Sequence, residues 1–207
     1  MPLAPELKAL IDSATTEREI LRWLKQKENA WILPPALKVA PFGKYAVPEF
    51  PFGTDYRADF VVMAPFSGGF DVQFIEMEPP NAPLFTQDGR PAARLAGALT
   101  QVRDWKMYVD RNRDTVLNEL SKFAEKEEVL FGRKSTILDS AGWPLYHPKA
   151  LINWCYHIVI GRRASLSEEQ LAKKAAFYQY ERVEVMTYDR LIDAAKEMDK
   201  GCFTVGA

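Results

Sequence analysis

Two strand-like segments separated by one helix-like segment make up the last third of the chain, and this order restricts the fold more than any other feature. Residues 152–162 (INWCYHIVIGR) and 183–189 (VEVMTYD) are rich in apolar and β-branched side chains, which indicates strands. Between them, Ser167 and Gln170 have the spacing of a capping box at the start of a helix. A helical connection of this length predicts two parallel neighbouring strands joined by a right-handed crossover.

A β-hairpin is expected in the first half of the chain. Residues 59–63 and 71–78 have strand-like composition, and the intervening APFSGG contains Gly68 and Gly69, which suit a hairpin loop. A hairpin is antiparallel whereas the later unit is parallel, so a sheet that contains both is mixed. The sequence therefore predicts an α/β fold, with a mixed β-sheet flanked by helices.

The remaining periodic segments predict helices around this sheet. Thr16 and Glu19 have capping-box spacing before an apolar set, and apolar residues recur at helical spacing between residues 91 and 112. Scattered prolines in residues 31–53 exclude a long helix there and indicate short edge segments. We expect a single domain over residues 1–207, with residues 1–35 as a helical segment packed on the core. The expected helices span residues 5–12, 16–28, 91–112, 114–127, 165–180 and 188–198.

Charge and cysteine content exclude several classes of protein. The chain has 27 Lys and Arg against 28 Asp and Glu, so it does not coat nucleic acid by bulk charge, and any such contact comes from local patches. Cys155 and Cys202 give no disulfide framework and no metal-binding pair. The sequence has no signal-peptide pattern and no apolar run near the roughly 20 residues of a membrane span. We therefore expect a cytoplasmic protein without membrane association.

Three carboxylates of the predicted hairpin are the strongest candidates for chemistry. Side chains two residues apart share a face of a strand, so Glu76 and Glu78 lie on the face of Phe74, and Asp59 lies on the face of Val61. If these faces coincide, Asp59 and Glu76 meet at the mouth of the hairpin, where their hard oxygen atoms suit Mg²⁺ or Mn²⁺. A metal there would activate water and neutralise charge on a phosphodiester. The alternative is that the acids are simply solvated at the end of a half-exposed sheet.

The other polar candidates are weaker. Gln101 lies beside the apolar stripe of the long predicted helix, where its amide would order a water or contact a phosphate, or would be an ordinary surface or packing residue. His147 and His157 have no Cys or His partner at zinc spacing, so we expect structural roles for both. Arg162 and Arg163 directly follow a predicted strand end and are candidates for nucleic-acid binding, although most basic pairs are solvated surface.

The order of these segments resembles the core of the Shedu anti-phage nucleases, a branch of the PD-(D/E)XK nuclease superfamily. TEREILRWLKQKENAWIL resembles the family's leading helix, and RADFVV resembles the strand that bears the motif aspartate. FIEMEPPNAPLFTQDGRPAARLAGALTQVRDWKMYV resembles the carboxylate strand, its proline-led loop and the helix with its glutamine, and IVIGRR and VMTYDRLI resemble the two late strands. The resemblance covers roughly residues 15–195 and implies a restriction-endonuclease-like core.

This resemblance implies a role for each candidate in the site. Asp59 and Glu76 correspond to metal-ligand carboxylates, and Gln101 corresponds to the helix glutamine that supports the site. Glu78 stands where the superfamily has a lysine, whose charge stabilises the attacking hydroxide or the pentacovalent phosphate. A glutamate does not supply that charge, but it would bind a second metal ion or accept a proton from water. The expected catalytic residues are therefore Asp59, Glu76, Glu78 and Gln101, of which the three acids are metal ligands.

The function implied by the resemblance is Mg²⁺- or Mn²⁺-dependent hydrolysis of DNA phosphodiester bonds in prokaryotic anti-phage defence, and RNA is not excluded as the substrate. The resemblance also implies the nuclease core alone, without the sensor domain that many such proteins carry. Because one chain has almost no net charge, we expect a homo-oligomer that builds a basic groove. The alternative is a catalytically weakened module that binds nucleic acid or protein, which the glutamate at position 78 and the charge balance favour.

Overall fold

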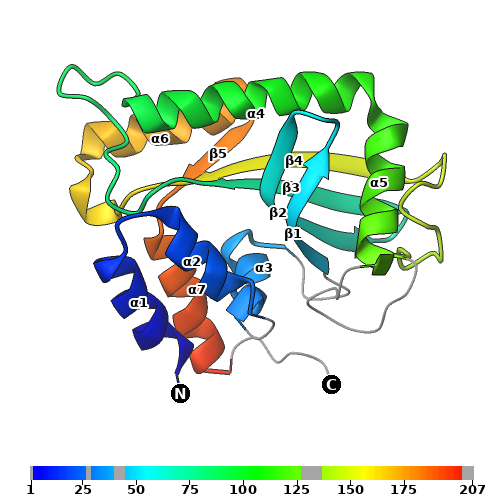
Figure 1. Ribbon diagram of the computed structural model, residues 1–207, viewed down its shortest axis with the longest axis horizontal. Coiled ribbons are helices and arrows are strands. Elements are labelled where there is room, and N and C mark those ends of the chain that lie inside the picture. The colour runs from blue at the N-terminus through cyan, green and yellow to red at the C-terminus, as the bar shows by residue number, and fades with distance from the viewer. Residues whose placement is uncertain (1, 27–28, 40–44, 127–136, 202–207) are drawn as a thin grey trace.

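A five-stranded mixed β-sheet forms the centre of the molecule, with helices on both of its faces (Figure 1). The computed structural model describes residues 2–26, 29–39, 45–126 and 137–201. In the order β1-β2-β3-β4-β5, the first two strand pairs are antiparallel and the last two are parallel. The predicted α/β fold with a mixed sheet is therefore confirmed. The strands are β1 (Tyr45–Phe52), β2 (Tyr56–Phe66), β3 (Gly69–Met77), β4 (Leu151–Val159) and β5 (Val183–Met186).

Each predicted helix has a described counterpart whose bounds agree to within a few residues, except that the helix expected over residues 16–28 already ends at residue 24. The short helices η1, α3 and η2 were not predicted. Residues 127–136, which include the expected end of one helix, lie outside the described part. In the part of the chain that the structure describes, no helix has the length and apolar character to cross a bilayer. The helices are α1 (Leu3–Ser13), α2 (Glu17–Leu24), η1 (Asn29–Ile32), α3 (Leu33–Ala36), α4 (Ala93–Arg111), α5 (Arg113–Lys126), η2 (Arg163–Ser165), α6 (Glu168–Glu181) and α7 (Asp189–Asp199).

The β2/β3 hairpin is longer than predicted, because both strands continue into the segment expected to form the loop. The paired residues extend to Phe66 and Gly69, which leaves only Ser67 and Gly68 as the turn. Gly68 has a φ of 85°, a left-handed backbone that glycine adopts without a Cβ clash. Gly69 lies so close to β4 that a Cβ on it would be 2.1 Å from the carbonyl oxygen of Leu151. Gly68 is therefore required by the turn, and Gly69 is required by the close approach of β4.

Only one of the two predicted capping boxes forms. At the start of α6, Ser167 Oγ accepts a hydrogen bond from the backbone N of Gln170 (3.3 Å), and Gln170 Oε1 accepts one from the backbone N of Ser167 (3.1 Å). Thr16 does precede α2 with an extended backbone, but its side chain makes no capping hydrogen bond within the described residues. The prediction is confirmed for α6 and wrong for α2.

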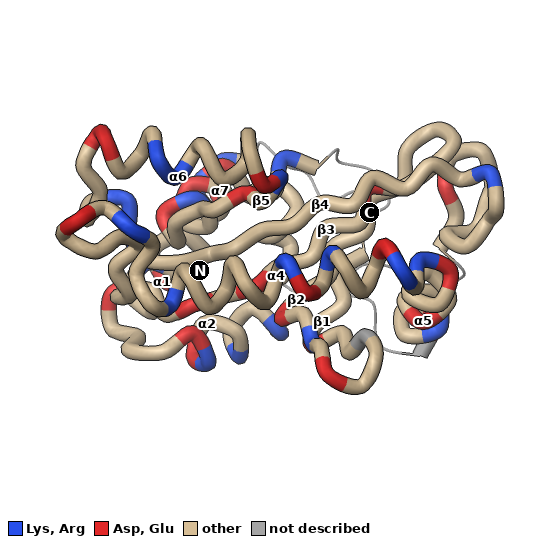
Figure 2. Tube along the Cα trace, turned by 90° about the horizontal axis from the view of Figure 1, so that it is seen from above, with Lys and Arg blue, Asp and Glu red and all other residues tan. Residues whose placement is uncertain are grey.

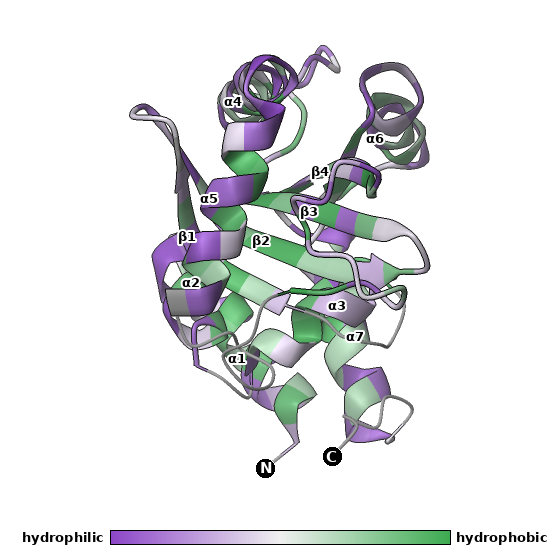
Figure 3. Ribbon diagram, turned by 90° about the vertical axis from the view of Figure 1, so that its right-hand side faces the viewer, coloured by the Kyte–Doolittle hydropathy of each residue, from purple (hydrophilic) through white to green (hydrophobic). Residues whose placement is uncertain are grey.

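Side chains alternate between the faces of the sheet and divide the core into two layers. Val72 and Phe74 of β3 pack with Trp105 of α4 and the apolar side of α5. Ile75 and Met77 of the same strand pack with α1, α2, α3 and α7 on the opposite face. Figure 3 shows the hydrophobic sheet enclosed between these two helix layers. By this alternation Glu76 belongs to the face that carries α4.

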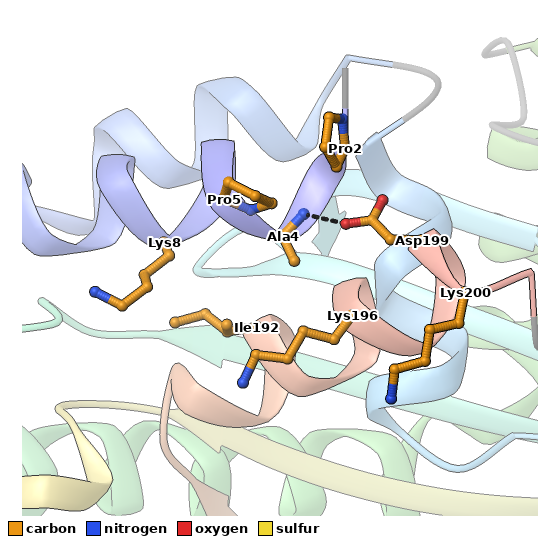
Figure 4. A pocket seen from close by; sticks show the side chains of 8 residues that line it. All are labelled: Pro2, Ala4, Pro5, Lys8, Ile192, Lys196, Asp199 and Lys200. Carbon is orange, nitrogen blue, oxygen red and sulfur yellow. Dashed lines mark hydrogen bonds between the residues drawn. The ribbon is translucent and has the colours of Figure 1, made fainter.

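The first helix is fastened to the last one. Asp199 at the end of α7 accepts hydrogen bonds from the backbone N atoms of Leu3 (2.8 Å) and Ala4 (2.9 Å). The first turn of α1 would otherwise leave these N–H groups unpaired. Figure 4 shows the bond to Ala4. An apolar hollow of about 480 Å³ lies between the two helices, with Lys8 and Lys196 in its lining (Figure 4). This contact helps to hold the N-terminal helices, including α2, against the sheet.

Candidate active site

Asp59 lies where strands β2 and β3 separate. The paired residues of the hairpin end at Phe60 and Ile75, so the next position along each strand is Asp59 and Glu76. Asp59 Oδ2 accepts a hydrogen bond from the backbone N of Met77 at 2.7 Å. The carboxylate thus accepts a hydrogen bond from a β3 N–H that lies just beyond the end of the ladder. The structure brings Asp59 and Glu76 together at the mouth of the hairpin.

Gln101 of α4 makes a hydrogen bond to the side chain of Glu76. The Nε2 atom of Gln101 donates a hydrogen bond to Glu76 Oε2 at 2.9 Å. Val102 and Trp105, on the buried side of the same helix, are fully enclosed in the core. Because these side chains fix the rotation of α4, the amide of Gln101 is aimed at the sheet. The structure therefore places Gln101 beside Glu76, and its part in a site, which the resemblance implied, stays a prediction.

Glu78 directly follows β3 and is held by three neighbours. The backbone N of Glu78 donates a hydrogen bond to the carbonyl of Val159 (2.8 Å). The hydroxyl of Tyr188, which is fully buried, donates a hydrogen bond to the carbonyl of Glu78 (2.8 Å). Its carboxylate lies 3.6 Å from the Nη1 atom of Arg94, in the first turn of α4. The side chain of Glu78 is 13% exposed and that of Arg94 is 66% exposed. A cation from the helix therefore faces the acid that stands in the lysine position.

Burial and mutual repulsion raise the pKa values of these acids. Burial raises the pKa of Asp59 to about 6. Burial, with the charges of Asp59 and Glu78, raises the pKa of Glu76 to about 9, against the opposing hydrogen bond from Gln101. Burial also raises the pKa of Glu78, while the charge of Arg94 lowers it. Desolvated carboxylates this close do not all ionise at neutral pH without a cation.

A fourth acid of this site comes from α2. Besides burial, the charge of Glu17 contributes to the raised pKa values of Asp59, Glu76 and Glu78, which places Glu17 near all three. No motif in the sequence singles out Glu17. An acid in the first turn of a helix is favoured by the helix dipole alone, and no sequence spacing relates α2 to the hairpin. Its only signal is that it lies in the stretch that resembles the leading helix of the family.

The donor atoms fit a hard divalent cation such as Mg²⁺ or Mn²⁺. Within the described residues, no three His, Cys, Asp or Glu side chains already converge on one metal position. Mg²⁺ commonly takes only one or two protein carboxylates and completes its shell with waters and substrate phosphates. Asp59 and Glu76 would meet that need, and a cation between them would replace protons that their raised pKa values retain. Metal binding by Asp59, Glu76 and Glu78 stays a prediction.

Both histidines have their contacts elsewhere. The ring of His147 stacks on Trp143 with 4.6 Å between ring centroids. His157 is buried in β4, and its Nδ1 lies 3.2 Å from Glu184 Oε2 on the neighbouring strand. These contacts agree with the structural roles expected for both residues. Cys202, the second cysteine of the chain, lies outside the described residues.

The two arginines after β4 are engaged with acids. Arg162 forms ion pairs with Asp12 of α1 and, at 3.2 Å, with Asp189 of α7. Arg163 pairs with Asp193 at 2.8 Å, and its side chain is more exposed than that of Arg162. These contacts tie the end of β4 to the helices below the sheet. Nucleic-acid binding by the pair stays a prediction, for which Arg163 has the freer side chain.

A family model matches most of the chain. The model described as "Shedu protein SduA, C-terminal" matches residues 14–192, which contain Glu17, the hairpin acids and Gln101. A search of curated proteins returned no significant match. The match spans the sheet, the candidate site and the covering helices other than α1 and most of α7. The chain therefore belongs to the Shedu family, and its residues 14–192 correspond to the C-terminal region of the Shedu protein SduA.

Proposed function

We propose that this protein is a divalent-metal-dependent nuclease that hydrolyses DNA phosphodiester bonds in anti-phage defence. Membership of the Shedu family supports the defence role. The observation that carries the nuclease assignment is the group formed by Asp59, Glu76 and Gln101. It combines two half-buried carboxylates of raised pKa with an amide that donates to one of them at 2.9 Å.

Asp59 and Glu76 are the proposed protein ligands of Mg²⁺ or Mn²⁺. Such an ion supplies positive charge to the phosphodiester and makes water a stronger nucleophile. Gln101 acts as a positioning residue in this scheme. By occupying Glu76 Oε2 it restricts the rotation of the carboxylate and leaves Oε1 for the ion.

Glu78 is the proposed general base. Its pKa is raised by burial, which brings it closer to the pH at which the protein works and makes the carboxylate a better proton acceptor. Its carboxylate stays close to the site because its backbone is bonded to Val159 and Tyr188. In this scheme Glu78 accepts the proton of the attacking water.

Arg94 is the proposed source of the charge that the lysine would have given. Its guanidinium lies 3.6 Å from Glu78 and is largely exposed, so it can contact a phosphate oxygen without losing an existing buried bond. Arginine binds phosphate with a planar, two-pronged donor set. Positive charge at this place stabilises the charge that develops on the phosphate in the transition state.

The second candidate function is a module that binds without catalysis. Two observations favour it: Glu78 replaces the lysine, and the chain has a net charge of only -1. Metal binding separates the two functions, because a binding module has no need of an ion between Asp59 and Glu76.

Cleavage of supercoiled plasmid and linear DNA tests the proposal. We expect the wild-type protein to cut in Mg²⁺ or Mn²⁺ and to be inactive in EDTA, and we expect Asp59→Ala to be inactive. Asp55→Ala is the matched control, because Asp55 is an exposed acid four residues earlier and bonds only its neighbour Thr54 among the described contacts. Equal activity of wild type and Asp59→Ala would contradict the proposal.

A further inference from the structure

A small polar pocket lies between α6, α7 and the end of β5, apart from the acids. Its volume is about 100 Å³, roughly that of three waters at about 30 Å³ each, which is enough for one phosphate group. Three of its lining residues are cations that come from three separate segments of the chain. The lining consists of Arg163, Leu171, Lys174, Met186, Thr187 and Arg190.

The positive charge of this pocket is only partly neutralised. Arg163 pairs with Asp193 at 2.8 Å, and Arg190 pairs with Glu184. Lys174 donates to the carbonyl of Val185 at 3.0 Å and forms no ion pair within the described residues. Three cations thus face two carboxylates that pair with them.

Lys174 also shows the electrostatic cost of this arrangement. Burial lowers its pKa, and the nearby charges of Arg190 and Arg163 lower it further, against the attraction of Glu184. A bound anion would relieve this repulsion. Along the Cα trace in Figure 2, Lys and Arg positions are interspersed with Asp and Glu positions.

The pocket lies on the same edge of the sheet as Glu78. Strands β3, β4 and β5 are parallel, so their C-terminal ends meet at one edge, and backbone bonds join them there. The backbone N of Gly161 donates to Pro79 O (3.3 Å), and the N of Tyr188 donates to Gly161 O (3.1 Å). The ends of β3 and β5 are separated by two strand spacings of about 4.8 Å each, which is about 10 Å. Three nucleotides of one DNA strand span about the same length.

We propose that Arg163, Lys174 and Arg190 bind a backbone phosphate of the DNA strand that enters the acidic site. This inference rests on the proposed nuclease function and names the contact that holds the strand beside it. A single phosphate satisfies Lys174 and adds the negative charge that the pocket lacks. Because the contact reads only the backbone, it makes binding tighter at every sequence.

Binding without metal tests the pocket separately from catalysis. We would measure the anisotropy of a fluorescein-labelled DNA duplex in EDTA at several salt concentrations. Lys174→Met should weaken binding several-fold and reduce the slope of log K against log salt by about 1, as loss of one phosphate contact does. Lys173→Met is the matched control, because the neighbouring Lys173 pairs with Glu169 and does not line the pocket. Equal slopes for the two variants, or no loss in either, would overturn the proposal.

Two further variants keep the test decisive if Lys174→Met does not fold. Arg163→Gln removes a half-exposed side chain and should lower the salt slope in the same way. Asp193→Asn frees both Arg163 and Lys196, which pairs with the same carboxylate at 3.0 Å, and it should strengthen binding. This gain should shrink in the Arg163→Gln background, and a gain of unchanged size there contradicts the role of Arg163.

Competition with inorganic phosphate tests whether the pocket binds a DNA backbone phosphate or a free phosphate ion. Inorganic phosphate should displace the duplex weakly from the wild type and less from Lys174→Met. Tight phosphate binding that depends on Lys174, with unchanged duplex binding, would overturn the proposal in favour of a small-anion site. Asp59→Ala separates the two proposals, because it should abolish cleavage in Mg²⁺ and leave duplex binding in EDTA intact.

Discussion

The amide of Gln101 donates a hydrogen bond to the carboxylate of Glu76 across 2.9 Å, although 25 residues separate the two in the chain. Gln101 belongs to a helix and Glu76 to a strand. The buried side chains of α4 fix the rotation of the helix, and this rotation directs Gln101 toward Glu76. A carboxylate whose pKa is raised to about 9 would not be expected to need a donor that favours its charged form. The bond is consistent with a site built for the ionised state of Glu76, which a divalent cation would restore.

Replacement of Gln101 tests this bond. Gln101→Ala should lower metal affinity or cleavage by about 10- to 100-fold, as loss of a bond to a metal ligand commonly does. Thr100→Ala is the matched control, because Thr100 lies one residue away and bonds only the helix carbonyl of Ala96 among the described contacts. Cleavage kinetics at several Mg²⁺ concentrations measure the effect. An equal response of both variants would show that Gln101 has no part in the site.

The charge supplied by Arg94 can be tested by moving it. Arg94→Ala should reduce cleavage by about tenfold or more, because a phosphate contact is lost. Adding Glu78→Lys to this variant returns a cation at the strand position but removes the proposed general base, so it should not restore the activity. Arg90→Ala is the control, since Arg90 is exposed and pairs with Asp88. Loss in both single variants to the same extent would contradict a specific role for Arg94.

The raised pKa values predict how the metal-free protein responds to pH. The folded state holds the protons of Asp59 and Glu76 more tightly than the unfolded chain does, since their pKa values rise to about 6 and about 9. Their contribution to stability is therefore fully present below the ordinary pKa values near 4 and is lost as the pH rises through the folded values. We expect the Tm in EDTA to fall between about pH 4 and about pH 9, and to fall less in Glu76→Gln. A wild-type Tm that rises across this range would contradict the burial of these acids.

Tyr188 provides a separate test of how Glu78 is positioned. Tyr188→Phe removes the hydroxyl that donates to the carbonyl of Glu78 at 2.8 Å and should cost about 1 kcal/mol in the free energy of unfolding. Cleavage should fall as well, because the segment after β3 loses one of its bonds. Tyr180→Phe is the control, because Tyr180 is 78% exposed. Urea denaturation and cleavage assays measure the two effects, and unchanged values for both in Tyr188→Phe would contradict the positioning role.

The hairpin shows how much of the site the sequence alone could predict. A period of two places Glu76 on the face of Phe74, and the glycines of the turn help to set the register that brings Asp59 beside it. The helical period likewise places Gln101 beside the buried stripe of α4. These residues could be predicted because each lies on an element whose pattern indicates which side is buried.

Other parts of the site depend on packing that no local pattern records. Glu17 and Arg94 occupy the first turns of two helices, and their approach to the hairpin depends on how α2 and α4 sit on opposite faces of the sheet. Arg162 and Arg163 stood out as a basic pair, yet the acids that engage them come from α1 and α7, far away in the chain. Charge partners of this kind emerge only in the folded protein.

Titration calorimetry with Mn²⁺ tests the central claim, that Asp59 and Glu76 form a metal site. The wild type should bind Mn²⁺ and release protons, because the raised pKa values keep the carboxyls partly protonated, and the affinity should increase with pH up to about 9. Glu76→Gln should lose this binding while keeping its fold, and Glu19→Gln, an exposed acid on α2, should bind as the wild type does. No Mn²⁺ binding by the wild type, or binding that Glu76→Gln retains, would contradict the account and favour the non-catalytic module.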